Sequence, residues 1–348
     1  MVRKKFKILA PFTNIAEIEP LKKAGADELY CGYVNDDLTK KWPLAFNILN
    51  RRGEGGSFEN HEDFKKAVKK ARACNLAVYV TLNGLYTPEQ YPLLHKLVKS
   101  IDCLEGVKGL IVADMGFLLF LRENNFKKEI HISTGGTCFN SHTAKFFENL
   151  GAKRIILDRA LTSYEIANII TRLHTKINFE IFIFAEPCGG FIDGFCTFFH
   201  CFEKANTVQM AKNIFLNLSY NTDQCEKGCM FYGDVLRNGH FEVFNVASHK
   251  RMKHGLRWMR SKAFSFGCRI CDLYDLKEYP IESLKIIGRG TRAVERVELI
   301  SKILQLLSCQ GISRESFQKH CKDLFSESVF KNKQRCTKFD CYYPDLSK

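Results

Sequence analysis

Short apolar runs alternate with amphipathic stretches along most of the chain. Eight runs have the length and apolar content of buried β-strands: Phe6–Phe12, Glu28–Gly32, Leu76–Leu82, Gly109–Ala113, Glu129–Ser133, Arg154–Leu157, Phe179–Ala185 and Leu284–Ile287. Helical periodicity predicts helices between them, for example at Ile15–Ala24, Glu62–Cys74, Pro88–Ser100, Ser141–Leu150 and Ser163–Leu173. Repeated strand–helix units predict a parallel sheet with right-handed crossovers. The expected fold is therefore an α/β, TIM-like (β/α)8 barrel, and an open doubly wound sheet is the alternative.

The regular alternation stops between the seventh and eighth predicted strands. We expect residues 1–185 to form the first seven strand–helix units, and residues 186–282 to form a cysteine-rich and basic insertion. Residues 283–310 then complete the barrel, and residues 311–348 form a C-terminal helical tail. An insertion after a barrel strand lies at the face where barrel active sites form.

Composition and charge narrow the class of protein. The 348 residues include 52 Lys and Arg against 38 Asp and Glu, a net charge of +14, with 45% hydrophobic and 26% charged residues. These fractions are typical of a globular protein and argue against a disordered chain. The apolar run Gly109–Leu121 is too short for a membrane helix and contains Asp114, and Ile8–Phe12 is too short for a signal peptide. We therefore expect a cytoplasmic protein with no membrane partner.

Polar residues follow several of the predicted strands. Because the carboxyl ends of barrel strands meet in one cup, these side chains should face a common space: Cys31, Asn83, Asp114, Ser133, Thr134, Asp158, Arg159 and Glu186. Asp114, Arg159 and Glu186 are the candidate catalytic residues, with Glu186 as a general acid or base. The alternative is that such residues cap the helices that follow.

Seven of the 15 cysteines lie between Cys188 and Cys271. Without an export signal, clustered cysteines indicate metal ligands or reactive thiols rather than disulfides. Their spacing over about eighty residues lacks the paired short knuckles of most structural zinc sites, which favours an iron–sulfur cluster over zinc.

Several segments carry a family resemblance in the correct order along the chain. The stretch from Glu180 to Cys188, continuing through Gly194-Phe-Cys196, resembles the signature of the collagenase-like peptidase family U32. Further similar segments are Ile8-Leu-Ala-Pro11, Ala24-Gly-Ala-Asp-Glu-Leu-Tyr30, Ala77-Val-Tyr-Val-Thr-Leu-Asn83, His131-Ile-Ser-Thr134 with Asn140, and Ser283-Leu-Lys-Ile-Ile-Gly-Arg289. Together they cover about residues 7 to 300.

The resemblance implies a barrel that holds an oxygen-sensitive 4Fe-4S cluster. Carried over position by position, the cluster ligands are Cys188, Cys196, Cys225 and Cys271, with Cys229 and Cys268 as alternates. The substrate-binding residues are expected to be Cys31, Asn83, Ser133, Thr134, Asn140, Lys285 and Arg289. The chain departs from the family at Ala185-Glu186-Pro187, where the family has small and aliphatic residues, and its first cysteine spacing is one residue longer.

A basic stretch near the cysteines indicates a possible partner. The window from His249 to Lys262 contains six Lys and Arg and no acidic residue. Its RNA-binding candidates are Lys250, Arg251, Lys253, Arg257, Trp258 and Arg260, because basic groups with an aromatic ring suit phosphate binding and base stacking. The alternative is a solvated helix whose apolar stripe docks on the barrel.

The leading hypothesis is oxygen-independent hydroxylation of an RNA pyrimidine or another small aromatic substrate, with a small-molecule oxygen donor and an electron donor. This activity is what the family resemblance implies, and the positive charge favours RNA among the substrates. Three alternatives stay open: a peptidase, a sulfur-transfer enzyme in which a cysteine such as Cys229 carries sulfur, and a non-enzymatic iron–sulfur partner protein. The peptidase has weak support, because the chain contains neither H-E-x-x-H nor G-x-S-x-G.

Overall fold

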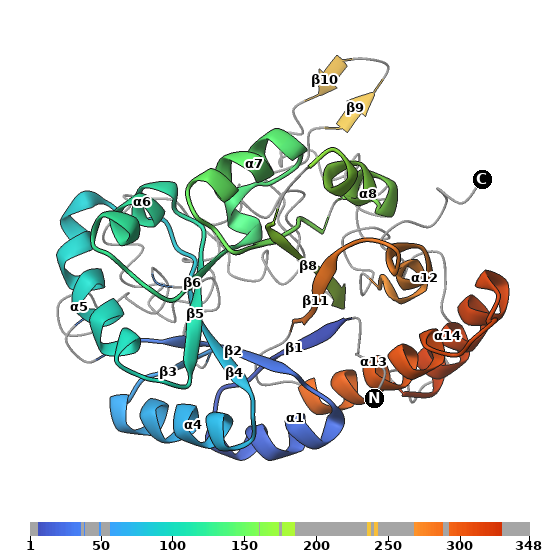
Figure 1. The fold of residues 1–348 in the computed structure, drawn as a ribbon, viewed down its shortest axis with the longest axis horizontal. Helices are drawn as coiled ribbons and strands as arrows, with labels where there is room; N and C mark the ends of the chain where they lie inside the picture. The colour runs from blue at the N-terminus through green and yellow to red at the C-terminus, as the bar shows by residue number, and fades with distance from the viewer. Residues whose placement is uncertain are drawn as a thin grey trace.

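The computed structural model describes residues 6–35, 38, 49, 56–159, 161–173, 176–184, 235–237, 240–242, 268–287 and 292–328. Within these residues strands and helices alternate along most of the chain from β1 to β8, and β11 is followed by two helices, α13 and α14 (Figure 1). The eight predicted strands are all present, and their ends agree with the prediction to within a few residues.

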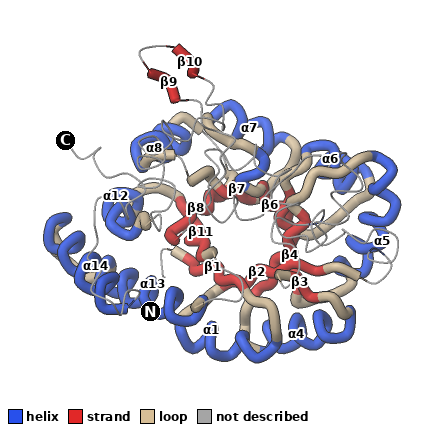
Figure 2. The backbone as a smooth tube through the Cα atoms, turned by 180° about the vertical axis from the view of Figure 1, so that it is seen from behind, coloured by secondary structure: helices blue, strands red, loops and turns tan. Residues whose placement is uncertain are grey.

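Eight parallel strands of the described chain close into a barrel. In the order in which they pair, they are β1 (Lys7–Pro11), β2 (Glu28–Tyr33), β4 (Ala77–Leu82), β5 (Val107–Val112), β6 (Glu129–Ile132), β7 (Arg154–Ile156), β8 (Asn178–Phe184) and β11 (Ile281–Ile286). Because β1 pairs with both β2 and β11, the sheet has no free edge along this ring. Figure 2 shows the strands as a central ring surrounded by helices, so the predicted (β/α)8 barrel is confirmed.

Helices cover the outside of the barrel. They are α1 (Ile18–Ala24), α4 (His61–Ala73), α5 (Tyr91–Asp102), α6 (Met115–Glu123), α7 (Ser141–Asn149), α8 (Ser163–Thr171), α12 (Leu273–Leu276), α13 (Ala293–Leu307) and α14 (Arg314–Ser328). Short 3-10 turns are η1 (Ile15–Glu17), η2 (Pro88–Gln90), η3 (Thr134–Gly136) and η7 (Ile270–Asp272). The predicted helical tail contains α14, which packs against α13. Among the described helices, none combines the length and the apolar character that a membrane crossing requires.

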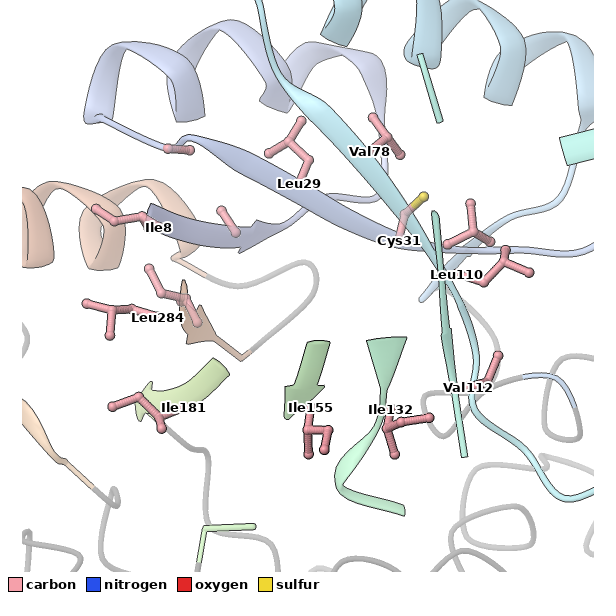
Figure 3. Close-up of a cluster of buried hydrophobic side chains, with 14 of the residues drawn as sticks. Ile8, Leu29, Cys31, Val78, Leu110, Val112, Ile132, Ile155, Ile181 and Leu284 are labelled. Carbon is pink, nitrogen blue, oxygen red and sulfur yellow. The ribbon is translucent and has the colours of Figure 1, made fainter. Parts of the chain in front are cut away.

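The main hydrophobic core lies between the barrel and these helices. Alternate residues of each strand point outward into it, including the buried Leu29 on β2, Val78 on β4 and Leu110 on β5 (Figure 3). The apolar face of α4, formed by Phe64, Ala67, Val68 and Ala71, lies in the same core. The remaining strand residues point into the barrel, and these determine what the interior can do.

Two further short strand segments accompany the barrel. The two-residue strand β3 (Ser57–Phe58) pairs with the end of β2. A small antiparallel pair, β9 (Val235–Arg237) and β10 (His240–Glu242), lies within the predicted insertion. Most of the insertion, including five of its seven cysteines, falls outside the described residues.

Candidate active site at the mouth of the barrel

Charged side chains fill the end of the barrel where the strands begin. Arg154, the first residue of β7, is only 1% exposed. Its Nη1 lies 2.7 Å from Glu28 Oε2 and 3.1 Å from Glu180 Oε2. Its Nη2 lies 2.8 Å from Glu282 Oε2. One buried guanidinium therefore holds carboxylates from β2, β8 and β11 together.

Two lysines complete this interior network. Lys7 Nζ lies 2.6 Å from Glu282 Oε1 and 3.2 Å from Glu28 Oε1, and Lys285 Nζ lies 3.0 Å from Glu180 Oε1. With Arg154, the network therefore has three cations and three carboxylates. Burial alone would raise the pKa of Glu28, but hydrogen bonds and charge from Arg154 outweigh it and hold that pKa below its usual value.

A buried histidine lies beside this network. His131, on β6, is fully buried and stacks on Tyr79, with ring centroids 4.4 Å apart. Burial lowers the pKa of His131, so its ring is neutral near pH 7. His131 Nε2 lies 3.2 Å from Glu129 Oε2, and Tyr79 donates to the same oxygen at 3.2 Å. The Nδ1 atom of His131 is buried and has no hydrogen-bond partner among the described residues.

An apolar and aromatic layer separates the ion network from the barrel mouth. It is formed by Leu9, Tyr30, Tyr79, Ile111, Ile156 and Phe182. Lys285 borders this layer, with its Nζ 4.2 Å from the centroid of the Tyr30 ring. The barrel interior is therefore packed, and a substrate can be held only above this layer.

Two of the predicted substrate-binding residues meet at the carboxyl ends of the strands. Asn83 follows β4 and Ser133 follows β6, and Asn83 Nδ2 donates to Ser133 Oγ at 3.2 Å. Ser133 Oγ also accepts from the backbone N–H of Gly135 at 3.3 Å, which makes Ser133 the cap of η3. The adjoining Thr134 is 4% exposed.

Arg159 and Asp158 approach the same end of the barrel from β7. The guanidinium carbon of Arg159 lies 5.6 Å from the centroid of the Phe182 ring. Asp158 is 3% exposed. Residues with acidic, basic, amide and hydroxyl side chains therefore follow the strands at one end of the barrel, and their role in binding a substrate stays a prediction.

Asp114 and Asn140 serve as helix caps. Asp114 Oδ1 accepts from the backbone N–H of Phe117 at 2.6 Å, and its Oδ2 accepts from Tyr86 N–H at 3.1 Å. Asn140 Oδ1 accepts from Thr143 N–H at 2.9 Å at the start of α7. Both residues therefore cap helices, which was the alternative expected for Asp114, and a contact of either residue with substrate stays a prediction.

Cys31 lies on the opposite side of its strand from the barrel interior. It shares the outward face of β2 with Leu29 (Figure 3). Tyr30, between them, belongs to the separate cluster inside the barrel. Its side chain is fully buried among the hydrophobic residues that contact the helices. The expectation that Cys31 faces the common cup is therefore wrong, because residues one apart on a strand face opposite sides.

The cysteine pair that closes the insertion is anchored to the barrel. Arg269, between Cys268 and Cys271, is 2% exposed, and its backbone N–H donates to Ile183 O at 3.1 Å. Its Nη2 donates to Arg159 O at 3.2 Å and also to Leu161 O. Cys268 is buried and Cys271 half-buried, and neither forms a disulfide with another described cysteine. These contacts tie the segment that carries both cysteines to β8 and to the loop that contains Arg159.

The remaining predicted site residues lie outside the described residues. They are the catalytic candidate Glu186, the substrate candidate Arg289, the cluster ligands Cys188, Cys196, Cys225 and Cys229, and the basic residues Lys250, Arg251, Lys253, Arg257, Trp258 and Arg260. The described part of the chain contains no group of three or more His, Cys, Asp and Glu side chains placed to hold a metal ion. The predicted cluster therefore stays a prediction.

Arg154, Glu28, His131 and Arg269 were not among the site residues predicted from the sequence. A signal for three of them was present. Arg154 and Glu28 begin apolar strands and His131 lies inside one, which is unusual for charged and ionisable residues unless they are paired. Arg269 gave no such signal, because it lies in a short segment between two cysteines.

These features define the class of protein as a (β/α)8 barrel with a polar site at the carboxyl ends of its strands. The chain belongs to peptidase family U32, whose family model matches residues 13–343. A solved structure described as a U32 peptidase is also similar, with a TM-score of 0.48 and 15% identity, over 81% of this chain and 94% of that one.

Curated relatives share one description. "tRNA hydroxylation protein P" of Helicobacter pylori is 28% identical over 53% of this chain and 40% of its own length. The protein of the same name from Escherichia coli is 25% identical over 52% of this chain and 37% of its own. "tRNA hydroxylation protein P2" of Bacillus subtilis is 26% identical over 51% and 52%. In each case the match spans about half or less of the relative.

Proposed function

We propose that this protein hydroxylates a pyrimidine base of tRNA without molecular oxygen and that it uses a 4Fe-4S cluster. The observation that carries the proposal is the description shared by the relatives, which are named tRNA hydroxylation proteins in three different organisms. The polar mouth of the barrel supports it, because hydrogen-bonding groups above an aromatic layer suit a planar heterocycle. The net charge of +14 suits a polyanionic substrate.

The two described cysteines of the insertion are suitable as ligands of such a cluster. Cys268 and Cys271 are two thiols three positions apart, at the edge of the barrel and held in place by Arg269. Thiolates in a protected, hydrogen-bonded environment are the usual ligands of iron–sulfur clusters. When bound, a cluster would supply electron transfer or activation of a substrate oxygen. The ligands proposed from the family are Cys188, Cys196, Cys225 and Cys271.

The residues at the mouth have distinct roles in this proposal. Asn83 and Ser133 contact the edge of the base, and Phe182 supplies an apolar surface beneath it. Arg159, whose guanidinium lies over the Phe182 ring, attracts the negatively charged substrate or an anionic oxygen donor. Lys285 stays paired with Glu180 and stabilises the layer on which the substrate rests.

The test is a nucleoside analysis of tRNA from a deletion strain and from the same strain carrying the gene. Mass spectrometry should find a pyrimidine nucleoside heavier by one oxygen atom in the wild type and in the complemented strain, and not in the deletion. Arg159→Gln should lower its amount, whereas Arg172→Gln, at the exposed end of α8, should not. Identical nucleosides in deletion and wild type would refute the proposed function.

The cofactor is tested separately from the activity. Protein purified without oxygen should contain about four irons per chain, as expected for one 4Fe-4S cluster. Cys271→Ser should lower the iron and sulfide content, and Cys309→Ser, at an exposed position of the C-terminal region, should leave it unchanged. A folded wild-type protein without iron would refute the cluster.

A further inference from the structure

An acceptor at the barrel mouth lacks a donor. Asn83 Oδ1 is buried and has no hydrogen-bond partner among the described residues, although the amide of the same side chain donates to Ser133. Leaving a buried acceptor unsatisfied costs about 1–3 kcal/mol. Buried polar groups are nearly always paired in native proteins, so an exception calls for a missing partner such as a ligand or a water.

The position of Asn83 places this acceptor on the inner side of the barrel. Leu82, Val112 and Ile132 pair across β4, β5 and β6, and all three point outward into the main core. The residues that follow them are Asn83, Ala113 and Ser133. Because successive side chains of a strand point to opposite faces, these three point into the barrel. The small side chain of Ala113 lies between the two polar ones and leaves room for the hydrogen bond that joins them.

Ser133 determines which atom of the amide is presented. Its Oγ accepts from the Gly135 backbone N–H at 3.3 Å and from Asn83 Nδ2 at 3.2 Å. With the nitrogen of the Asn83 amide directed at Ser133, the oxygen is directed at a different partner. The pair therefore offers an acceptor on an inward-facing row above the apolar layer that contains Phe182 and Ile111.

We infer that Asn83 Oδ1 accepts a ring N–H of the substrate base and that Ser133 orients it. This rests on the proposed function, because it takes the ligand to be a nucleobase. Uracil carries a hydrogen on N3, whereas N3 of cytosine has a lone pair that would face the carbonyl oxygen of Asn83. Asn83 thus selects bases with a ring N–H donor, and Ser133 is a positioning residue that acts through it.

The inference is tested by removing the acceptor from the protein and the donor from the ligand. The probes are short single-stranded RNAs of uridine, of N3-methyluridine and of cytidine, and equilibrium binding to the full chain is measured by fluorescence anisotropy. Wild type should bind the uridine RNA about tenfold more tightly than either of the others, since one well-formed buried hydrogen bond is worth about that ratio. Asn83→Ala should reduce this ratio to near one.

Two further variants keep the test decisive if Asn83→Ala folds poorly. Asn83→Asp retains an acceptor oxygen and should keep the preference for uridine over N3-methyluridine. Ser133→Ala retains Asn83 but frees its amide to rotate, so the ratio should fall to an intermediate value. Asn60→Ala is the matched control, because Asn60 Oδ1 caps the exposed start of α4, where it accepts from Glu62 N–H at 2.8 Å. It should leave the ratio as in wild type.

The outcomes separate this inference from the proposed function. If Asn83→Ala and Ser133→Ala both retain the wild-type ratio, the role of Asn83 is overturned, even where the nucleoside analysis shows hydroxylation. If the ratio collapses as expected while tRNA from the deletion strain is unchanged, base recognition stands and the hydroxylation proposal fails.

Discussion

Replacing Arg154 by methionine tests whether the ion network inside the barrel stabilises the fold. The substitution keeps an unbranched side chain of similar length and removes the guanidinium that contacts Glu28, Glu180 and Glu282. Three carboxylates would then share two lysines. Glu180 is fully buried and Glu28 is 3% exposed, so water cannot replace the lost partner.

The expected loss follows from what remains of the network. Breaking a buried ion pair by removing one partner costs about 3–5 kcal/mol. Lys7 still contacts Glu28 and Lys285 still contacts Glu180, so we expect the lower end of that range, about 3 kcal/mol. Adding Glu28→Gln to Arg154→Met restores equal numbers of cations and carboxylates, and this double variant should regain part of the loss.

The assay is urea unfolding of the full chain followed by far-UV circular dichroism at pH 7. The matched control is Arg72→Met, which removes a solvent-exposed pair with Glu105 and should leave the unfolding midpoint unchanged. The reasoning is refuted if Arg154→Met unfolds at the same urea concentration as wild type. It is also refuted if adding Glu28→Gln to Arg154→Met lowers the free energy of unfolding further, by the full cost of losing a second buried ion pair.

Three further outcomes follow from named side chains. The pKa of Glu28 is lowered in the folded state, so ionised Glu28 stabilises the fold above its unfolded pKa of about 4.5. This contribution is lost as the pH falls through the folded pKa. Glu28→Gln should therefore make the free energy of unfolding less dependent on pH in the acid range. Asp114→Ala removes the cap on Phe117 N–H and should cost about 1 kcal/mol in urea unfolding, and no change would contradict the capping role. Burial raises the pKa of the Cys138 thiol to about 12, so peptide mapping after iodoacetamide treatment at pH 8 should show exposed Cys103 alkylated first.

The strand pattern predicted the barrel because outward-facing strand residues are apolar in almost every unit. Val78 and Val80 on β4, with Leu110 and Val112 on β5, are all in the core against the helices. The inward face carries charges at the start of several strands, and pattern alone does not reveal which cation meets which carboxylate. That pairing depends on barrel closure, which brings Glu28 and Arg154 together across 126 residues of sequence.

The boundary between β5 and α6 shows why the role of a site residue is harder to predict than its place. In the sequence, Gly109–Leu121 is one apolar run interrupted only by Asp114. The structure divides the run at that residue, because the Asp114 carboxylate accepts the Phe117 N–H and starts α6. A carboxylate at a strand end can equally cap a helix or bind a ligand, and sequence position is the same in both cases.

Alternation along the strands settles a different question, which candidates face the barrel interior and which face the outer core. Cys31 falls on the outward row with Leu29, whereas Asn83 and Ser133 fall on the row after outward-facing Leu82 and Ile132. Once one residue such as Tyr79 is known to face the interior, every second residue along its strand faces the interior as well. This count separates residues that face the cup from residues that face the outer core. By that count Asn83 is the second inward position after Tyr79, one beyond Thr81, and the unsatisfied oxygen belongs to this residue.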